Sequence, residues 1–321
     1  MSTTHPTDPP SESDLHVIVG AGAVGAATAR RLAREGRRVR VVTRSGSAGT
    51  DCPGEHHAVD ASDPEALIRV SRGAVAIYNC ANPPYHRWAA DWPPLAASLL
   101  ATAESTGAVL VTMSNLYGYS DPGEPLTEES PRQPSSRKGR IRAAMWDDAL
   151  AAHRAGRVRA TEARASDFLG AEVGANAHMG DRVVPRVLRG RPVSVLGDPT
   201  QLHSWTAVED TARTLAILGT DERAWGRAWH VPTAPPVTAT DLIGRLAVLA
   251  GREPVKVRSV PRLVFSVARL LSRDLRELEE MFYQFERPFV IDSSAFTKEF
   301  GVDPTALDDT LEAVIAHYRT R

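Results

Sequence analysis

A glycine-rich turn near the N-terminus has the residue types and the spacing that binding of a phosphate group requires. The apolar segment 15–19 leads directly into Gly20-Ala-Gly22-Ala-Val-Gly25. Glycine permits a tight turn at Gly20, a close approach of backbone to a pyrophosphate at Gly22, and close packing of a following helix at Gly25. The free N–H groups and the dipole of that helix favour negative charge at its first turn. The pattern therefore predicts a dinucleotide-binding site rather than an ordinary turn.

The residues that follow the second apolar segment bear on which dinucleotide is bound. Residues 39–43 predict a buried strand, which ends at Arg44 and Ser45. An acidic residue at this strand end usually holds the ribose 2′-hydroxyl of NAD, whereas an arginine accommodates a 2′-phosphate. Arg44 is a permanently charged, forked donor, and Ser45 adds a hydroxyl group. These residues favour NADP(H) over NAD(H), and the alternative is that Arg44 is only a solvated side chain.

Lysine is rare in this chain, so each lysine position is informative. Of 38 basic residues, only three are lysine: Lys138, Lys256 and Lys298. Lys138 and Arg142 are four residues apart in a predicted helix and therefore share one face of it. A neighbouring guanidinium and partial desolvation disfavour the ammonium form, which suits a lysine to act as general acid or base, or as a Schiff-base nucleophile. The alternative is a solvated lysine that opens a helix after a serine pair.

Alternating strand and helix patterns must position these residues. Further strands are predicted at 56–60, 73–80, 108–113 and 158–165, and helices are predicted from 63–64 onward, at 95–106 and at 138–155. Continuous apolar strands that alternate with helices are typical of a parallel sheet covered by helices on both faces. We therefore predict an α/β fold with a doubly wound parallel sheet, the Rossmann arrangement.

The pattern of elements changes after about residue 168. Short strands at 192–196 and 228–231 are mixed with predicted helices near 208–219, 238–250, 261–285 and 304–319. We expect a disordered tail at 1–14, a dinucleotide-binding domain at 15–168, and a smaller, mostly helical substrate-binding region at 169–321. Some segments of the last region are expected to return to the sheet.

Composition narrows the class of protein. The net charge of −1 over 321 residues favours neither nucleic acid nor an anionic membrane as a partner. No apolar run is long enough to span a bilayer, and the first residues lack the apolar core of a signal peptide. Cys52 and Cys80 suit a reducing compartment and have no metal-ligand spacing. We expect a cytoplasmic protein that acts on a small molecule and holds no metal.

Several short motifs occur in an order and spacing typical of one family. They are Asp60-Ala61, Asn79-Cys-Ala-Asn82, Ser114-Asn-Leu-Tyr117-Gly118, Arg164-Ala-Ser-Asp-Phe-Leu-Gly170 and His203-Ser-Trp-Thr-Ala-Val-Glu-Asp210. Together with the glycine turn, they resemble the extended short-chain dehydrogenase/reductases, the NAD-dependent epimerase/dehydratase family, over nearly the whole chain. The turn itself departs from the G-x-x-G-x-x-G that is usual in extended members.

The resemblance implies which residues contact the cofactor. It places Asp60 and Ala61 near the adenine, Ala81 and Asn82 near the nicotinamide ribose, and residues 165–168 over the nicotinamide. The expected cofactor-binding residues are Gly20, Gly22, Ala23, Val24, Gly25, Arg44, Ser45, Asp60, Ala61, Ala81, Asn82, Met113, Lys138, Ala165 and Ser166.

The usual catalytic residues of this family are missing. They are a serine after the fifth strand and a Tyr-x-x-x-Lys pair on the next helix, and the chain contains no Tyr-x-x-x-Lys. The resemblance places Lys138 at the tyrosine position and Arg142 at the lysine position. The serine position falls on Met113, or on Ser114 after a shift of one residue. The catalytic candidates are Lys138, Arg142, Ser114 and Tyr117, with Tyr119 as a further proton donor.

The resemblance also places the substrate between the carboxyl edge of the sheet and the later region, as in other open α/β sheets. The candidate substrate residues are Tyr85, Trp88, Tyr117, Phe168, Asn176, Trp205 and Tyr283. Their aromatic character favours an apolar or aromatic substrate over a nucleotide sugar.

Three functions follow from this sequence as alternatives. The first is an NADP(H)-dependent oxidoreductase that acts on a small, fairly apolar carbonyl compound or alcohol. The second is a non-redox isomerase, dehydratase or cyclase that uses Lys138 as its acid or base. The third is a non-catalytic NADP(H)-binding regulator. The family usually dimerises by pairing two helices of each subunit, so a homodimer is expected through the helices near 95–106 and 138–155.

Overall fold

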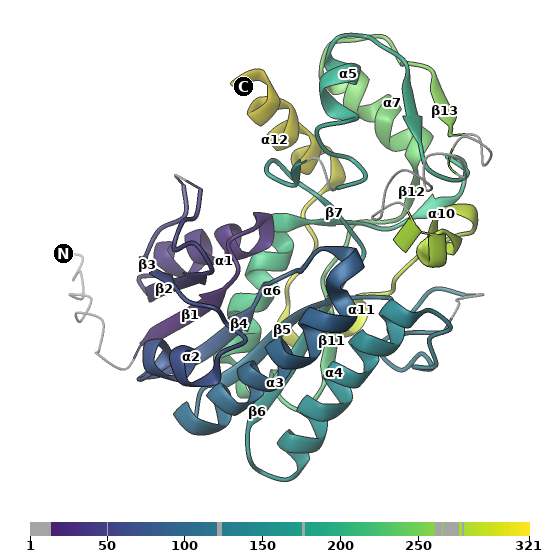
Figure 1. Ribbon diagram of the computed structural model, residues 1–321. Coiled ribbons are helices and arrows are strands. Elements are labelled where there is room, and N and C mark those ends of the chain that lie inside the picture. Colours follow the sequence, from purple (N-terminus) through teal and green to yellow (C-terminus); the bar gives the residue numbers. More distant parts are fainter. Residues whose placement is uncertain are drawn as a thin grey trace, which may run out of the picture.

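The computed structural model describes residues 14–49, 51–120, 124–174, 177–260, 265, 276–277 and 279–321. Within these residues, seven parallel strands form the central sheet in the order β11-β6-β5-β4-β1-β2-β3 (Figure 1). The chain enters the sheet at β1, moves outward to β3, and then returns to β4 and continues in the opposite direction. This strand order confirms the doubly wound fold predicted from the sequence.

Strands and helices alternate along most of the sheet domain. The strands are β1 (Leu15–Val19), β2 (Arg38–Thr43), β3 (Glu55–Ala58), β4 (Ala74–Asn79), β5 (Val109–Asn115), β6 (Arg159–Ala165) and β11 (Ala228–His230). The helices are α1 (Ala23–Arg34), α2 (Pro64–Ser71), α3 (Trp88–Thr106), α4 (Arg137–Arg154) and α6 (Val208–Thr220). Contacts place α1 and α6 on one face of the sheet, and α2, α3 and α4 on the other.

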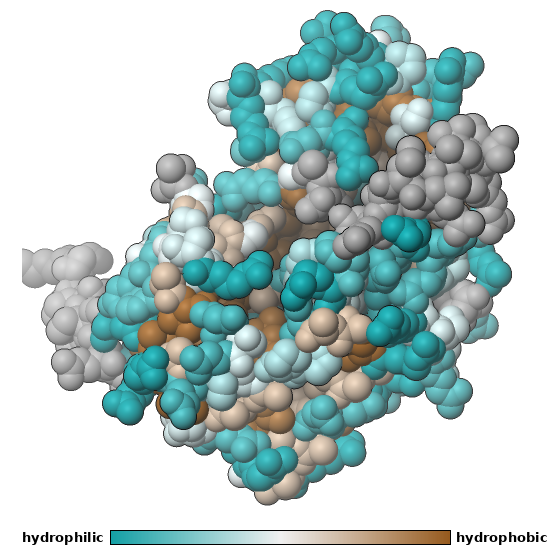
Figure 2. Space-filling model, in the orientation of Figure 1, coloured by the Kyte–Doolittle hydropathy of each residue, from teal (hydrophilic) through white to brown (hydrophobic). Residues whose placement is uncertain are grey.

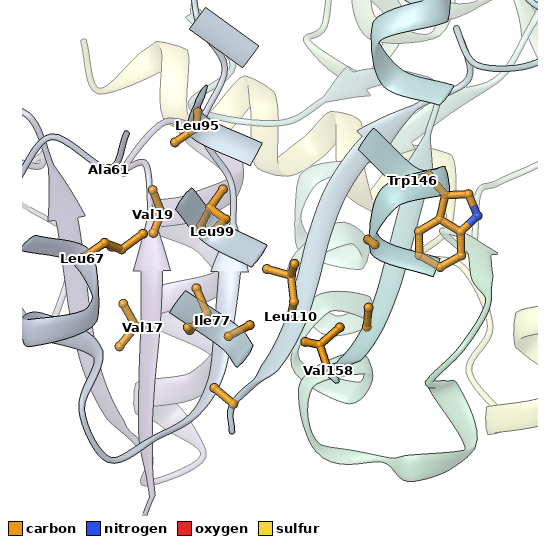
Figure 3. Packing of buried hydrophobic residues seen from close by; sticks show 14 of the residues in the cluster. Val17, Val19, Ala61, Leu67, Ile77, Leu95, Leu99, Leu110, Trp146 and Val158 are labelled. Atoms are coloured by element: carbon orange, nitrogen blue, oxygen red, sulfur yellow. The ribbon is translucent and has the colours of Figure 1, made fainter. Parts of the chain in front are cut away.

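Two apolar cores hold the layers together, one on each face of the sheet. Successive residues of a strand point to opposite faces. Val17 and Val19 of β1 therefore pack beneath α2 and α3 with Leu67 and Leu99 (Figure 3), whereas Ile18 packs on the α1 and α6 side. Both faces of the sheet are thus buried, which explains why its central strands are continuous apolar runs.

Helix α3 begins earlier than the sequence predicts. It starts at Trp88 rather than near residue 95, although Pro93 and Pro94 lie within its first two turns. Trp88 and Trp92 are 2% and 0% exposed, and they anchor this part of the helix in the core. Burial of two large aromatic side chains outweighs the backbone hydrogen bonds that the prolines remove.

The smaller region combines helices with short strand pairs. Its elements are β7 (Asp167–Leu169), α5 (Val184–Leu188), β8 (Val193–Val195), β9 (Leu202–His203), β10 (Trp205–Ala207), β12 (Val237–Thr238), α7 (Ala239–Leu249), β13 (Val257–Ser259), α10 (Tyr283–Glu286) and α12 (Leu307–Arg319). Leu242, Ile243, Leu311 and Val314 belong to a separate core in this region. It lies at the top of Figure 1, above the carboxyl edge of the sheet.

Some segments of the later chain return to the sheet domain. Strand β11 pairs with β6, α6 covers the sheet, and α11 (Ser294–Phe300) packs against β11. Most of the helix predicted at 261–285, and the tail at 1–13, lie outside the described residues. No helix within the described part of the chain combines the length and the apolar character needed to cross a membrane.

Candidate active site

The glycine turn brings β1, α1 and the end of β4 into close contact. Gly20 has φ of +98°, and a Cβ atom there would lie 2.8 Å from backbone atoms of Ala81. A Cβ atom at Gly25 would lie 1.9 Å from the carbonyl oxygen of Gly20. Both positions therefore exclude any larger residue, for the steric reasons that the sequence pattern predicts.

Gly22 differs from these two glycines because open space surrounds it. It is the N-terminal cap residue of α1, where no side chain caps the helix. A Cβ atom at Gly22 would meet no protein atom within 4 Å. Free space beside uncapped N–H groups at a helix N-terminus is the arrangement that a pyrophosphate group requires. The residues present therefore fit a dinucleotide.

A cavity of about 660 Å³ extends from this turn along the carboxyl edge of the sheet. Eight of the predicted cofactor-binding residues line it: Gly20, Gly22, Arg44, Ser45, Asp60, Ala61, Ala81 and Asn82. Residues around the start of α3 complete the wall, including Pro83, Arg87, Asp91, Pro94 and Leu95. None of these five is among the predicted site residues, and four of them precede residue 95, where the sequence places the start of the helix.

Two arginines and two aspartates line one part of this cavity: Arg44 and Asp60 follow β2 and β3, and Arg87 and Asp91 lie around the start of α3. Arg87 donates two hydrogen bonds to Asp91, at 2.8 and 2.7 Å, and this pair is the main cause of the lowered pKa of Asp91. Hydrogen bonds from the Ser62 N–H and hydroxyl groups hold the pKa of Asp60 below its usual range. The positive charge of Arg44 contributes to both shifts, so Arg44 lies near both carboxylates.

The other predicted cofactor-binding residues lie outside the lining of this cavity. Ala23 and Val24 belong to the first turn of α1. Met113, Lys138, Ala165 and Ser166 lie at the carboxyl ends of β5 and β6 and at the start of α4. The Met113 carbonyl oxygen accepts a hydrogen bond of 3.4 Å from Arg142 Nη1.

Lys138 is buried at the start of α4 and forms two ion pairs. Its Nζ atom lies 2.5 Å from Glu277 Oε2 and 2.6 Å from Glu280 Oε1, and the residue is 1% exposed. The sequence pattern predicts a guanidinium beside this ammonium group and indicates neither carboxylate. That expectation is corrected, because the Nζ atom pairs with two carboxylates. The carboxylates could not be found from spacing, since they are about 140 positions away along the chain.

Two residues beside Lys138 fix the start of α4. The Ser136 hydroxyl oxygen accepts a hydrogen bond of 2.9 Å from the Gly139 N–H, which makes Ser136 the helix cap that the serine pair predicts. A Cβ atom at Gly139 would lie 2.2 Å from the Tyr117 carbonyl oxygen. Gly139 therefore lets α4 approach the segment after β5 and brings Lys138 towards Tyr117.

Arg142 is enclosed by aromatic rings. Its guanidinium carbon lies 4.8 Å from the Trp88 ring centroid and 4.2 Å from that of Trp92. Burial lowers the pKa of Arg142 to about 10. The Nε atom has no hydrogen-bond partner among the described residues. Trp88, predicted as a substrate residue, is thus a buried neighbour of this cation.

Two tyrosines form a hydrogen-bonded pair at the same edge of the sheet. The hydroxyl oxygens of Tyr85 and Tyr117 are 2.9 Å apart, and Lys138 Nζ lies 5.5 Å from the Tyr85 ring centroid. Burial raises the pKa of both phenols, and nearby Asp167 adds to the effect. Tyr119, in contrast, lies 2.7 Å from Arg164 Nη1 and 2.7 Å from His230 Nε2 in a separate buried network.

The other residues predicted to be catalytic or to bind substrate do not form one cluster with the tyrosine pair. Ser114 is buried at the carboxyl end of β5, and Phe168 packs partly buried against α1 and α6. Trp205 is 4% exposed and belongs to an aromatic cluster with His178 and His203. Tyr283 lies 6.1 Å from Phe289 between ring centroids. Asn176 lies outside the described residues.

The sheet order, the glycine turn and the cavity beside it define a protein of the Rossmann class. The chain belongs to the NAD dependent epimerase/dehydratase family, whose model matches residues 16–230. No curated protein sequence matches the chain.

Solved structures share the fold over nearly the whole length. One is dTDP-glucose 4,6-dehydratase from Bacillus anthracis in complex with NAD, with a TM-score of 0.77 and 17% identity, covering 96% of this chain and 97% of that one. Another is UDP-glucose 4-epimerase from Thermus thermophilus with NAD, with a TM-score of 0.75 and 18% identity, covering 95% and 99%. A third is MoeE5 with UDP-glucose and NAD, with a TM-score of 0.77 and 19% identity, covering 95% and 98%.

Proposed function

We propose that this protein is an NADP(H)-dependent oxidoreductase of the short-chain dehydrogenase/reductase type, acting on a small, fairly apolar carbonyl compound or alcohol. The observation that carries the proposal is the cavity beside the glycine turn, where eight of the residues expected to bind a dinucleotide meet. Membership of a family named for NAD-dependent enzymes supports it. NAD is present in the structures of the 4,6-dehydratase, the 4-epimerase and MoeE5.

The preference for the phosphorylated cofactor rests on the end of β2. Arg44 and Ser45 line the cavity there, at the place where an NAD-specific site usually has an acidic residue. A guanidinium offers forked, charged donors to a 2′-phosphate. Arg87 lines the same cavity and adds a second guanidinium.

The chemistry divides between the cofactor and the side chains at the edge of the sheet. A bound nicotinamide supplies or accepts hydride. The Tyr85 and Tyr117 phenols are protonated near neutral pH and are the proposed proton donors to a developing alkoxide. Burial raises their pKa values and weakens them as acids, so the mechanism needs positive charge beside them. Lys138 and Arg142 place positive charge beside the phenols, and Lys138 remains the proposed acid or base on α4.

The second candidate is a non-redox isomerase or dehydratase on the same scaffold. Its support is the family itself, together with structural neighbours named as a 4,6-dehydratase and a 4-epimerase. The third candidate is a non-catalytic NADP(H)-binding regulator. The two carboxylates that hold Lys138, and methionine at the position of the usual serine, favour this third candidate over a conventional enzyme.

Calorimetric titration with NADP⁺, NADPH, NAD⁺ and NADH tests the proposal directly. We expect tight binding of the phosphorylated forms. Arg44→Ala should weaken NADPH binding by about tenfold or more and leave NADH binding unchanged, because it removes a charge-assisted bond to phosphate. Arg69→Ala is the matched control, since Arg69 is exposed on α2 and does not line the cavity.

The outcome separates the three functions. If folded protein binds none of the four nucleotides, the proposal is wrong. If it binds NADPH, carbonyl compounds are screened by the loss of nicotinamide absorbance, which a non-redox enzyme or a regulator would not show. Once a reaction is identified, Lys138→Ala should slow it strongly, and an unchanged rate would remove Lys138 from the mechanism.

A further inference from the structure

A hydrogen-bonded polar pair lies outside the cavity beside the glycine turn, and the proposed reaction does not use it. His203 Nε2 lies 2.8 Å from Asp167 Oδ2. The His203 side chain is 6% exposed, whereas that of Asp167 is 25% exposed. The histidine side chain is thus enclosed, while the Asp167 side chain keeps part of its surface accessible. An accessible carboxylate oxygen is an acceptor for a donor group of a ligand.

The pair is held in place by backbone pairing. Asp167 starts β7 and lies opposite Trp205 of β10 in a parallel register. His203 belongs to β9, and the following Ser204 N–H donates a hydrogen bond of 3.0 Å to the Phe289 carbonyl oxygen. Both residues therefore lie in extended backbone that hydrogen bonds to neighbouring segments hold in place. A carboxylate oriented in this way is pre-organised for binding.

Aromatic rings surround the pair. The His203 ring centroid lies 4.5 Å from that of Trp205 and 5.5 Å from that of Phe289. His178 stacks on Phe285 with centroids 4.5 Å apart and planes 6° apart. Burial lowers the pKa of His178 to about 4, so this ring is neutral near pH 7. The surroundings suit an apolar or aromatic ligand body.

The pair also lies near the proposed proton donors. The negative charge of Asp167 contributes, after burial, to the raised pKa values of Tyr85 and Tyr117. Figure 1 places β7 between the sheet domain and the smaller region, and Figure 2 shows the surface hollowed between these two parts. A ligand bound beside the tyrosines would therefore lie within reach of the charge of Asp167.

Among the residues that the structure describes, the cations around this place are already engaged or exposed. Lys138 is held by two glutamates, and Arg142 is enclosed between two tryptophans. Arg182 is close enough to His178 to influence its pKa, but Arg182 is exposed at the surface. Within the described residues, an anionic group beside Asp167 would thus meet a carboxylate without a free buried cation, and the repulsion between like charges disfavours its binding.

We propose that Asp167, oriented by His203, anchors the substrate by accepting a hydrogen bond from a hydroxyl or ammonium group, and that it rejects substrates bearing phosphate or carboxylate. This inference rests on the proposed function and narrows its substrate class to neutral or cationic compounds with an apolar body. This substrate class differs from UDP-glucose, the compound present in two of the similar solved structures.

Three probes that share a benzene ring test the proposal: benzylamine, benzyl alcohol and benzoate. Calorimetry on NADPH-loaded protein should show benzylamine and benzyl alcohol binding at least about tenfold more tightly than benzoate. Asp167→Asn keeps the size of the side chain and removes its charge. It should reduce the preference for benzylamine over benzoate by about tenfold. Asp309→Asn, at an exposed position on α12, removes the same charge elsewhere and should change nothing.

Three results would overturn the proposal: tighter binding of benzoate than of benzylamine by the wild type, no binding of benzylamine, or an unchanged preference in Asp167→Asn. Asp167→Ser replaces the asparagine variant if thermal unfolding shows that the latter does not fold. NADPH titration of the same proteins keeps the two proposals separate. Equal NADPH affinity in wild type and Asp167→Asn assigns the residue to the substrate side. If wild type fails to bind NADPH, the proposed function fails, and the probes then test Asp167 on the cofactor-free protein.

Discussion

The three glycines of the turn serve different purposes, although they lie within a few positions of one another. Gly20 and Gly25 are required by close contacts inside the protein, whereas Gly22 faces open space. The first two thus maintain the packing of α1 on the turn. Gly22 leaves room for a bound ligand. The sequence motif predicts these different roles, and the close contacts at Gly20 and Gly25 and the open space at Gly22 agree with them.

Substitution of two of these glycines should separate stability from binding. Gly25→Ala places a methyl group against the Gly20 carbonyl oxygen and should destabilise the fold by about 1–3 kcal/mol, because backbone atoms cannot move aside easily. Gly22→Ala should leave thermal unfolding almost unchanged and still weaken NADPH binding strongly, since the methyl group occupies the proposed pyrophosphate position. Thermal unfolding and calorimetry measure the two effects, and equal destabilisation by both variants would contradict this assignment.

At the scale of elements, close contact between backbone segments and burial of aromatic side chains position the candidate catalytic and cofactor-binding residues. Gly139 allows the start of α4 to contact the segment after β5, which brings Lys138 beside the tyrosines. Trp88 and Trp92 anchor an early start of α3, which adds Arg87 and Asp91 to the dinucleotide cavity. Two histidines, His16 in β1 and His230 in β11, are also buried in the packed interior of the sheet domain.

Three histidines with lowered pKa values make the stability of the fold depend on pH. Burial lowers the pKa of His16, His178 and His230 from the ordinary value of about 6.5. Between pH 6.5 and the lower folded values, the unfolded chain binds more protons, so stability falls as pH falls. For His178, with a pKa of about 4, the loss at pH 5 is on the order of 2 kcal/mol.

Urea unfolding at pH 7.5 and pH 5 measures this dependence. His178→Phe keeps an aromatic ring to stack on Phe285 and cannot be protonated, so it should reduce the loss of stability between the two pH values. An equal loss in wild type and His178→Phe would show that His178 does not contribute. The comparison is made without ligand, so that substrate binding does not enter it.

At the scale of the whole molecule, the outer face of α3 and α4 suits contact with a second copy. Residues of both helices line a groove of about 560 Å³, among them Ala97, Leu100, Ile141, Ala144 and Met145. Figure 2 shows weakly to strongly hydrophobic residues gathered over these two helices. Isologous pairing of this face would cover it, in agreement with the homodimer predicted from the family resemblance.

Light scattering after size-exclusion chromatography tests the dimer. We expect a mass of twice the 34.7 kDa of one chain. Ala144→Glu puts a charge at an exposed position in the groove and should give a monomer that still binds NADPH. Val248→Glu adds the same charge at an exposed position on α7 and should remain dimeric. A wild-type monomer at micromolar concentration would contradict the prediction.

The sequence by itself determined the α/β class, the doubly wound sheet and the glycine turn, because these depend on local periodicity and on glycine at three nearby positions. It also identified eight residues of the cavity lining. Only the tertiary structure decided the partners of Lys138, the enclosure of Arg142 by two tryptophans, and the pairing of Asp167 with His203. These contacts join residues that are distant along the chain, and no local pattern records which side chains folding brings within hydrogen-bond distance.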